Sequence, residues 1–286
     1  MESINILGVP HAYELTPQPT TASEFPVLIF IHGWLLSHNY WQPLIDRLAP
    51  SYQCLSYDLR GFGDSRRTPE DLNNSFTLAA YAQDLSILLQ ELNIEKAWLV
   101  GHSLGGSIAL WGAQQCYEKI IGVICLNSGG GIYIKEEFDR FRSAGQQLVK
   151  LRPSWLLSLP GVDLLLARTM VERPLARHWG RQRAIDLIKA DRLAATRALL
   201  DSTTETEVKL LPKIVSKLSQ PVFFLAGTQD KVMELKYVRH LASFHQLFES
   251  NGKNVIEIHN CGHFSMVEQT EIVTSKIFGI LKEYSS

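Results

Sequence analysis

The most informative segment of the sequence is Trp98-Leu99-Val100-Gly101-His102-Ser103-Leu104-Gly105-Gly106. Its first three residues end a short apolar run of strand character, and the residues after it are rich in Ala, Leu and Ile, as expected of a buried helix. A serine at such a strand-to-helix turn presents its hydroxyl, while Gly101 and Gly105 let the turn pass close to its neighbours without a Cβ clash. The segment therefore predicts that Ser103 is a nucleophile, although G-x-S-x-G alone would also fit a glycine-rich helix start.

Short apolar runs alternate with amphipathic segments of helical length on both sides of this turn. Runs typical of strands buried on both faces occur at residues 26–31, 52–57, 97–100, 120–126, 222–226 and 255–258. Apolar residues at three- and four-residue spacing predict covering helices at residues 40–48, 78–92, 104–116, 235–248 and 272–281. This alternation predicts an α/β fold with a mostly parallel sheet and helices on both faces.

The alternation stops between about Gly131 and Gln220, where no convincing strand occurs and Arg and Leu recur at helical spacing. We predict a core domain of residues 1–130 and 221–286 with a mainly helical cap, residues 131–220, inserted into it. The cap contains a strongly apolar stretch, residues 155–166. This stretch is either a lid that lines an apolar substrate pocket and touches a membrane surface, or a helix packed on the cap's own core.

The cap also carries a cluster of basic residues. One or two of them could bind a carboxylate or phosphate on the substrate, since a guanidinium forks onto such groups. The favoured interpretation is a solvated helix face paired with Glu172, Asp186 and Asp191. The cluster consists of Arg168, Arg173, Arg177, Arg181, Arg183, Lys189, Arg192 and Arg197.

A serine hydroxyl needs a base, and the base needs an orienting carboxylate. Asp230 lies just beyond the apolar strand at 222–226, and His263 lies in the loop after the last predicted strand. Both therefore belong where the ends of parallel strands converge. The order Ser103, Asp230, His263 is the nucleophile, acid, base order of the α/β-hydrolase fold.

From about Val27 to Leu281 the sequence resembles the α/β-hydrolase superfamily. Besides Gly-His-Ser-Leu-Gly-Gly, it has family landmarks in family order at residues 32–34 (His-Gly-Trp), 58–65 (Asp-Leu-Arg-Gly-Phe-Gly-Asp-Ser), 227–230 (Gly-Thr-Gln-Asp) and 262–264 (Gly-His-Phe). By this resemblance, the backbone N–H groups of Trp34 and Leu104 would form the oxyanion hole. The Trp34 side chain would either wall the pocket or pack against the cap.

Other acids and histidines near these landmarks are assigned structural roles. Asp58 and Asp64 are expected to hold a turn through local hydrogen bonds. His32 and His102 are likewise expected to make structural hydrogen bonds rather than to act as bases. Some relatives place the acid after the strand that follows the nucleophile helix, but that position reads Leu126-Asn127-Ser128-Gly129, without a carboxylate.

These features predict a serine hydrolase that cleaves a small to medium, hydrophobic carboxylic ester through an acyl-enzyme. The same triad would also serve a C–C bond hydrolase, a thioesterase, an amidase or a lyase of the menaquinone-pathway type. A catalytically silent, ligand-binding relative would be a different class of protein, and it would have to lose a member of the triad.

Composition limits the alternatives further. The 286 residues are 45% hydrophobic and 20% charged, which excludes a disordered, collagen-like or coiled-coil chain. The 28 Lys and Arg against 29 Asp and Glu give a formal net charge of −1, so nucleic acid is not an expected partner. The four cysteines form no C-x-x-C pair, and no basic start with an apolar run or long apolar span is found. We expect a cytoplasmic protein with no transmembrane segment, no cofactor and no metal.

Overall fold

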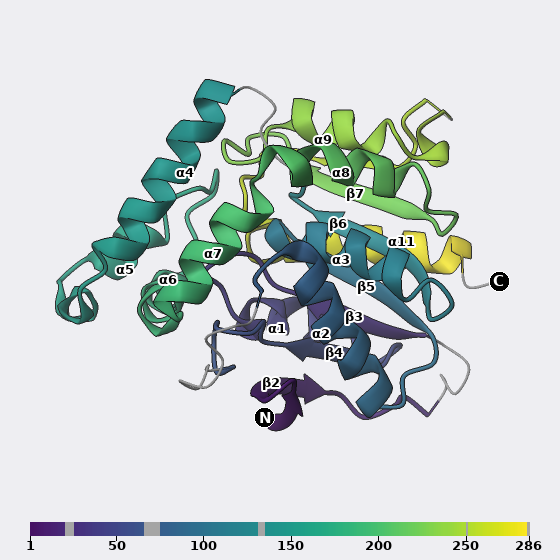
Figure 1. Ribbon diagram of the computed structural model, residues 1–286, viewed down its shortest axis with the longest axis horizontal. Coiled ribbons are helices and arrows are strands. Elements are labelled where there is room, and N and C mark those ends of the chain that lie inside the picture. Colours follow the sequence, from purple (N-terminus) through teal and green to yellow (C-terminus); the bar gives the residue numbers. More distant parts are fainter. Residues whose placement is uncertain (21–25, 66–74, 131–134, 250, 285–286) are drawn as a thin grey trace.

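An eight-stranded sheet forms the centre of the computed structural model, which describes residues 1–20, 26–65, 75–130, 135–249 and 251–284 (Figure 1). The strand order is β1-β2-β4-β3-β5-β6-β7-β8, and all neighbours from β4 to β8 are parallel. The predicted α/β fold with a mostly parallel sheet is thereby confirmed. The strands are β1 (Glu2–Ile6), β2 (Val9–Leu15), β3 (Val27–Ile31), β4 (Cys54–Tyr57), β5 (Ala97–His102), β6 (Ile120–Leu126), β7 (Val222–Gly227) and β8 (Val255–Ile258).

The N-terminal hairpin of β1 and β2 is absent from the predicted strands. The two strands are antiparallel, and β2 pairs antiparallel with β4 at the edge of the parallel sheet. A two-residue turn joins them, in which Leu7 and Gly8 both have positive φ, 52° and 89°. Such turns ordinarily carry Asn-Gly or Asp-Gly, so Leu-Gly gives a weak hairpin signal.

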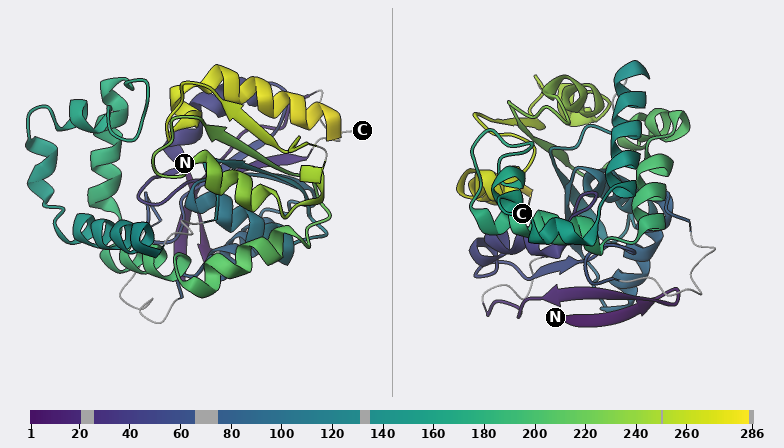
Figure 2. Two further views of the ribbon diagram at one scale, coloured as in Figure 1. Left: turned by 90° about the horizontal axis from the view of Figure 1, so that it is seen from above. Right: turned by 90° about the vertical axis from the view of Figure 1, so that its left-hand side faces the viewer.

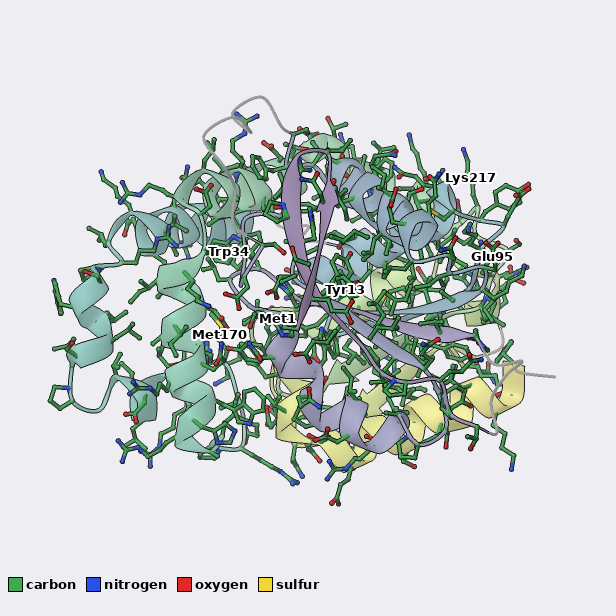
Figure 3. The ribbon with its side chains drawn as sticks, turned by 90° about the horizontal axis from the view of Figure 1, so that it is seen from below. Met1, Tyr13, Trp34, Glu95, Met170 and Lys217 are labelled. Carbon is green, nitrogen blue, oxygen red and sulfur yellow. The ribbon has the colours of Figure 1, made fainter. Side chains whose placement is uncertain are left out.

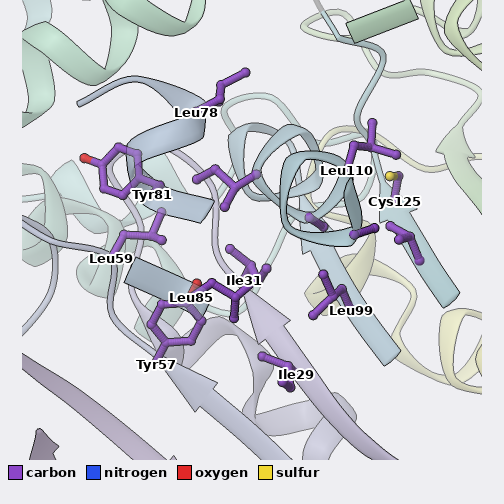
Figure 4. Close-up of a cluster of buried hydrophobic side chains, with 14 of the residues drawn as sticks. Ile29, Ile31, Tyr57, Leu59, Leu78, Tyr81, Leu85, Leu99, Leu110 and Cys125 are labelled. Carbon is purple, nitrogen blue, oxygen red and sulfur yellow. The ribbon is translucent and has the colours of Figure 1, made fainter. Parts of the chain in front are cut away.

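Side chains of the parallel strands alternate between two buried layers because successive residues of a strand point to opposite faces. Ile29 and Ile31 of β3 belong to the layer covered by α2 and α3, part of which Figure 4 shows. Leu28 and Phe30 of the same strand belong to the layer covered by α1 and α11. Burial on both faces explains why these strands read as continuous apolar runs rather than alternating ones.

The helices that cover the sheet lie close to the predicted ranges. The segment expected at 40–48 begins as a 3-10 turn, η1, and the one expected at 235–248 ends at Ala242 as a regular helix. His245, fully buried, follows this end, and its ring contacts the carbonyl of Gln220 at 3.0 Å and accepts the N–H of Leu247 at 3.2 Å. The covering elements are η1 (His38–Trp41), α1 (Gln42–Leu48), α2 (Leu78–Glu91), α3 (Leu104–Gln115), α9 (Leu235–Ala242), η4 (Gln246–Glu249), α10 (Ser265–Glu268) and α11 (Thr270–Tyr284).

A helical insert separates β6 from β7, and its described residues contain no strand. Figures 1 and 2 show α4 to α7 projecting beyond one end of the sheet, whereas α8 packs on α3 and α9 over the sheet. Residues 131–134 of the predicted cap lie outside the described part of the chain, and the division into two domains stays a prediction. The insert consists of α4 (Lys135–Lys150), η3 (Ser154–Ser158), α5 (Val162–Leu166), α6 (Arg177–Lys189), α7 (Arg192–Ser202) and α8 (Glu205–Val215).

The apolar stretch at residues 155–166 forms two short helices, η3 and α5, with a break at Pro160 and Gly161. Neither helix buries a residue fully. Four of its apolar side chains are half-buried, whereas the other four, Trp155, Leu159, Leu164 and Leu165, are exposed and do not pack on the cap's own core as expected.

Candidate active site

Ser103 sits at the turn between β5 and α3, the position that the sequence motif predicts. Its backbone has φ 52° and ψ −117°, a conformation that L-residues rarely adopt, and its N–H donates to the carbonyl of Leu126 at 3.0 Å. A Cβ at Gly101 would lie 2.3 Å from the carbonyl oxygen of Gly105, and one at Gly105 would lie 2.1 Å from that of Ile31. The two glycines therefore allow the strained turn, as expected.

Gly105→Ala is expected to destabilise the protein because the added methyl meets backbone of β3 that cannot move away. We expect a loss of about 3 kcal/mol, or roughly 5–10 °C in Tm. The matched control is Gly279→Ala, since Gly279 lies in α11 and no neighbouring element comes within 4 Å of the place that its added methyl would take. There alanine should raise stability by about 0.5–1 kcal/mol through helix propensity. Thermal melts of both variants test the pair, and equal effects would contradict the steric argument.

Asp230 and His263 are joined by a hydrogen bond of 2.8 Å between Asp230 Oδ2 and His263 Nδ1. Burial alone would raise the pKa of Asp230, but His263 and the N–H donors around the carboxylate outweigh it and leave this pKa below its ordinary value. The backbone N–H groups of Val232 and Met233 donate to Oδ1 at 2.8 and 2.9 Å. Because an ionised Asp230 only accepts, Nδ1 of His263 is the donor and Nε2 is left to accept a proton.

Asn127, directly after β6, is a site residue that the sequence reasoning did not find. Its Nδ2 donates to Asp230 Oδ2 at 2.9 Å and to the carbonyl of Gly262 at 3.0 Å, so it holds the acid and the histidine loop together. The sequence signal was present, since Asn127 follows the strand next to β7. Asn127 was missed because only carboxylates were considered at this position, whereas its amide orients the carboxylate of Asp230.

The loop that carries His263 is also held by the insert and by Glu268 of α10. The N–H of His263 donates to the carbonyl of Met170 at 2.8 Å. The carboxylate of Glu268 accepts the N–H groups of Gly262, Glu172 and Arg173 at 2.9–3.1 Å. The insert therefore contributes to the position of His263 through backbone hydrogen bonds, and no side-chain motif in the sequence predicts these bonds.

His32 and His102 make the structural hydrogen bonds expected of them. His32 donates from Nδ1 to the carbonyl of Gly33 at 2.8 Å and accepts the N–H of Leu59 at 2.9 Å, and burial lowers its pKa. The Nε2 of His102 lies 2.8 Å from the carbonyl oxygen of His263, and burial followed by the nearby His263 ring lowers the pKa of His102 to about 3. Both rings are neutral at ordinary pH and are engaged in holding loops.

Asp58 holds its turn as expected, but Asp64 acts differently. Asp58 accepts the N–H of His38 and of Asp64, each at 2.7 Å. The carboxylate of Asp64 instead pairs with Lys189 of α6 at 2.7 Å and so ties the core to the insert.

Two members of the cap's basic cluster pair with other acids than the expected ones. Arg177 pairs with Asp163 at 2.8 Å and Arg197 with Asp201 at 3.2 Å. Asp186 is buried and accepts from Gln182 at 2.9 Å and from Ser37 of the core at 3.2 Å. These partners are set by how α6 docks on the core, which residue spacing does not reveal.

Asp186 is expected to make stability fall as pH rises. Burial raises its pKa to about 7, and the charge of Asp58 acts in the same direction. Between the ordinary aspartate pKa and about 7 the folded state therefore binds more protons than the unfolded chain, so stability conferred by protonation is lost across this window. Asp186→Asn should raise stability at pH 8 by about 2 kcal/mol more than at pH 5.5. Denaturant melts at the two pH values test this, and an equal change at both would contradict it.

Trp34 and Leu104 line the pocket together with Ser103. Within the described residues the backbone N–H of neither residue donates to a protein acceptor. The Trp34 indole donates to the carbonyl of Ala195 in α7 at 2.8 Å and also lines the pocket above Ser103, so it packs on the insert and walls the pocket at once. Figure 3 places Trp34 and Met170 at the junction of the sheet and the insert.

The pocket at Ser103 is a small cavity of about 80 Å³ that opens to solvent. Its surface is mostly apolar, with four hydroxyl-bearing side chains besides Ser103. Core and insert both contribute to it. The lining residues are Trp34, Ser103, Leu104, Ser107, Ser128, Gly130, Phe141, Leu199, Ser202, Thr203, Val232 and Met233.

The structure thus brings Asp230 and His263 into direct contact and places Ser103, Trp34 and Leu104 at the pocket. His102, which precedes Ser103, packs on His263 with ring centroids 4.8 Å apart. No hydrogen bond joins Ser103 to His263 in the described residues, and His263 is only 5% exposed. In unliganded enzymes such bonds are often long and tighten when substrate binds. The described side chains include no group of three or more His, Cys, Asp or Glu placed to hold a metal.

The sheet order, the serine turn and the acid–histidine pair define a class of protein. The family model of the alpha/beta hydrolase fold matches residues 26–270, and the chain belongs to this family. The chain is 32% identical over 125 residues to 3-oxoadipate enol-lactonase 1 of Acinetobacter baylyi, which is 44% of this chain and 45% of that protein. It is 27% identical over 229 residues to the magnesium-chelatase 30 kDa subunit of Rhodobacter capsulatus, covering 75% and 74%. The chain spans less than half the length of the first curated relatives it matches.

Solved structures show the same fold at low identity. A thermophilic esterase from Thermogutta terrifontis superposes with a TM-score of 0.77 at 20% identity, covering all of both chains. The enol-lactonase from Burkholderia xenovorans LB400 superposes with a TM-score of 0.73 at 16% identity, covering 98% of this chain and 100% of that one. At these identities the likeness concerns the fold.

Proposed function

We propose that this protein is a serine hydrolase that cleaves carboxylic esters with a hydrophobic acyl or alcohol group. The observation that supports this proposal best is a serine in a strained strand-to-helix turn that lines a mostly apolar pocket. A buried Asp230–His263 pair accompanies it, formed by the residues that follow β7 and β8. A strained backbone is retained where the surrounding structure enforces it, and such positions cluster at functional sites.

In the proposed reaction His263 Nε2 removes the proton of Ser103 as the hydroxyl attacks the ester carbonyl. The negative charge on the carbonyl oxygen is stabilised by the N–H groups of Trp34 and Leu104. Asp230 keeps the imidazole in one tautomer and stabilises its charged form. His263 then protonates the leaving alcohol, and the acyl-enzyme is hydrolysed by a water that the same ring activates.

The lining of the pocket supports an ester with an apolar acyl chain. Phe141, Leu199 and Val232 supply apolar walls, which favour such a chain over a free polar acid. We therefore expect hydrolysis of p-nitrophenyl esters to be fastest between butyrate and octanoate and to fall for acetate and palmitate. A clear preference for acetate would contradict an apolar acyl site.

A lactone is the second candidate substrate, favoured by the similarity to an enol-lactonase. A lactone is a cyclic ester and requires the same attack and the same oxyanion stabilisation. Hydrolysis of dihydrocoumarin beside the linear esters distinguishes the two. If no ester or lactone is cleaved while Ser103 still reacts with a fluorophosphonate, the thioesterase, amidase, lyase and C–C hydrolase alternatives replace the ester proposal. Failure of Ser103 to react would favour a silent binding protein.

A further inference from the structure

Exposed apolar side chains gather in one part of the insert, the segment from Leu148 to Met170, which we call the outer apolar segment. Leu151 is 70% exposed, Trp155 61% and Leu165 66%. Protein surfaces carry single exposed apolar residues routinely, but a concentration of large ones marks an interaction surface. The exposed members of the segment are Leu148, Leu151, Trp155, Leu159, Leu164, Leu165 and Met170.

Local packing explains why these side chains stay uncovered. Helix α5 rests on α6 at Gly180, where a Cβ would lie 1.7 Å from the carbonyl oxygen of Asp163. The two helices therefore approach each other backbone to backbone at this point, and Leu164 and Leu165 of α5 remain exposed. Figures 1 and 2 show α5 at the end of the insert farthest from the sheet. Among the described elements, only its neighbours in the insert lie beside it there.

Positive charge surrounds the outer apolar segment. Residues 148–183 contain seven Lys and Arg but only two carboxylates, whereas the whole chain has a net charge of −1. Arg177 is paired with Asp163, but four other cations of this region are exposed and form no ion pair among the described residues. These four are Lys150, Arg168, Arg173 and Arg181.

Apolar side chains flanked by unpaired cations match a surface that is apolar within and negatively charged outside. A second copy docked through the same patch would bring two basic surfaces together, which opposes a symmetric dimer. We propose that the outer apolar segment binds the surface of a bilayer containing anionic lipid, with Trp155 and the leucines in the headgroup region. No helix in the described residues is long and apolar enough to cross a membrane, so the mode of binding is interfacial.

One end of the outer apolar segment is hydrogen-bonded to the loop of the candidate active site that carries His263. The carbonyl of Met170, at the end of the segment, accepts the N–H of His263, and the backbone of Arg173 beyond it is fastened to Glu268. The Met170 end of the segment therefore contacts the loop of His263, whereas α5 lies farther from it. The binding itself uses neither Ser103 nor the pocket, so it goes beyond the proposed hydrolase activity.

Cosedimentation with sucrose-loaded vesicles tests the proposal. We expect the full chain to pellet with phosphatidylcholine vesicles containing about one-third phosphatidylglycerol, and not with phosphatidylcholine alone. The double variant Trp155→Ser with Leu165→Ser should bind about tenfold more weakly. The triple variant Lys150→Gln, Arg168→Gln and Arg181→Gln should lose the preference for anionic lipid. The matched control is Tyr117→Ser, since Tyr117 is 66% exposed but lies between α3 and β6.

Several outcomes would overturn the proposal. These are no pelleting with either vesicle, pelleting of the double variant equal to that of the wild type, or an equal loss in Tyr117→Ser. A dimer in sedimentation velocity that the double variant dissociates would assign the segment to a second copy instead. Hydrolysis of a soluble p-nitrophenyl ester, measured on every variant without vesicles, separates the two proposals: loss of vesicle binding with full ester hydrolysis concerns the segment alone.

Discussion

Ser103→Ala is expected to lower kcat/KM for p-nitrophenyl esters by about 10⁴-fold or more, because the variant lacks the atom that attacks the carbonyl. The fold should persist, since alanine meets the same backbone conformation at φ 52° and removes no buried hydrogen bond that the structure shows. Steady-state kinetics with fluorophosphonate labelling measure the effect. Labelling should disappear together with turnover.

The control for this result is Ser275→Ala, a serine exposed on α11 far along the chain from the pocket. It should retain wild-type turnover and labelling. If Ser103→Ala keeps more than a small part of the activity with an unchanged Tm, the nucleophile is another residue, and the assignment of the motif fails.

Asp230→Asn is expected to lower kcat by about 10³- to 10⁴-fold with little change in KM. The reason is the tautomer of His263: an amide nitrogen facing Nδ1 would favour the proton on Nε2, the atom that has to accept the proton of Ser103. Since the pKa of Asp230 is already below its ordinary value, the wild-type carboxylate is charged throughout the neutral range and its own titration should not appear in the pH profile above about pH 6.

Two further variants make the Asp230 result specific. Asp46→Asn changes an exposed carboxylate of α1 and should leave kcat unchanged. Asn127→Ala removes the amide that holds Asp230 without touching the reacting atoms, so it should lower kcat by about 10-fold and alter the pH dependence of kcat/KM. A loss in Asp230→Asn that is matched by unfolding in a thermal melt would point to a structural role only.

Much of the fold could be predicted because it depends on local patterns. Strands buried on both faces produce continuous apolar runs. The turn at Ser103 requires glycine where its backbone packs closely against neighbouring backbone. Both features can therefore be recognised from consecutive residues of the sequence. The edge hairpin β1–β2 was missed because a Leu-Gly turn lacks the usual side-chain signal. The end of α9 was missed because no Pro or Gly marks it in the sequence.

The site shows the same division. Asp230 and His263 could be named because each follows a predicted strand and because strand ends meet at one edge of a parallel sheet. Asn127 and Glu268 could not, since their roles depend on which N–H groups and carboxylates lie within hydrogen-bond reach of them after folding. The ion pairs of the insert were not predicted correctly for the same reason. Lys189 of the insert pairs with Asp64 of the core, and the spacing of residues along a helix cannot predict such a pair.

The amino-acid sequence alone determined the class of fold, the order of its parallel strands along the chain and the three residues proposed for catalysis, because these follow from periodicity, small residues and position after a strand. The tertiary structure decided which groups orient those residues, which walls the pocket has and which apolar side chains remain exposed. Burial, hydrogen-bond partners and charge pairing arise between segments far apart in the chain, and neither periodicity nor spacing carries that information.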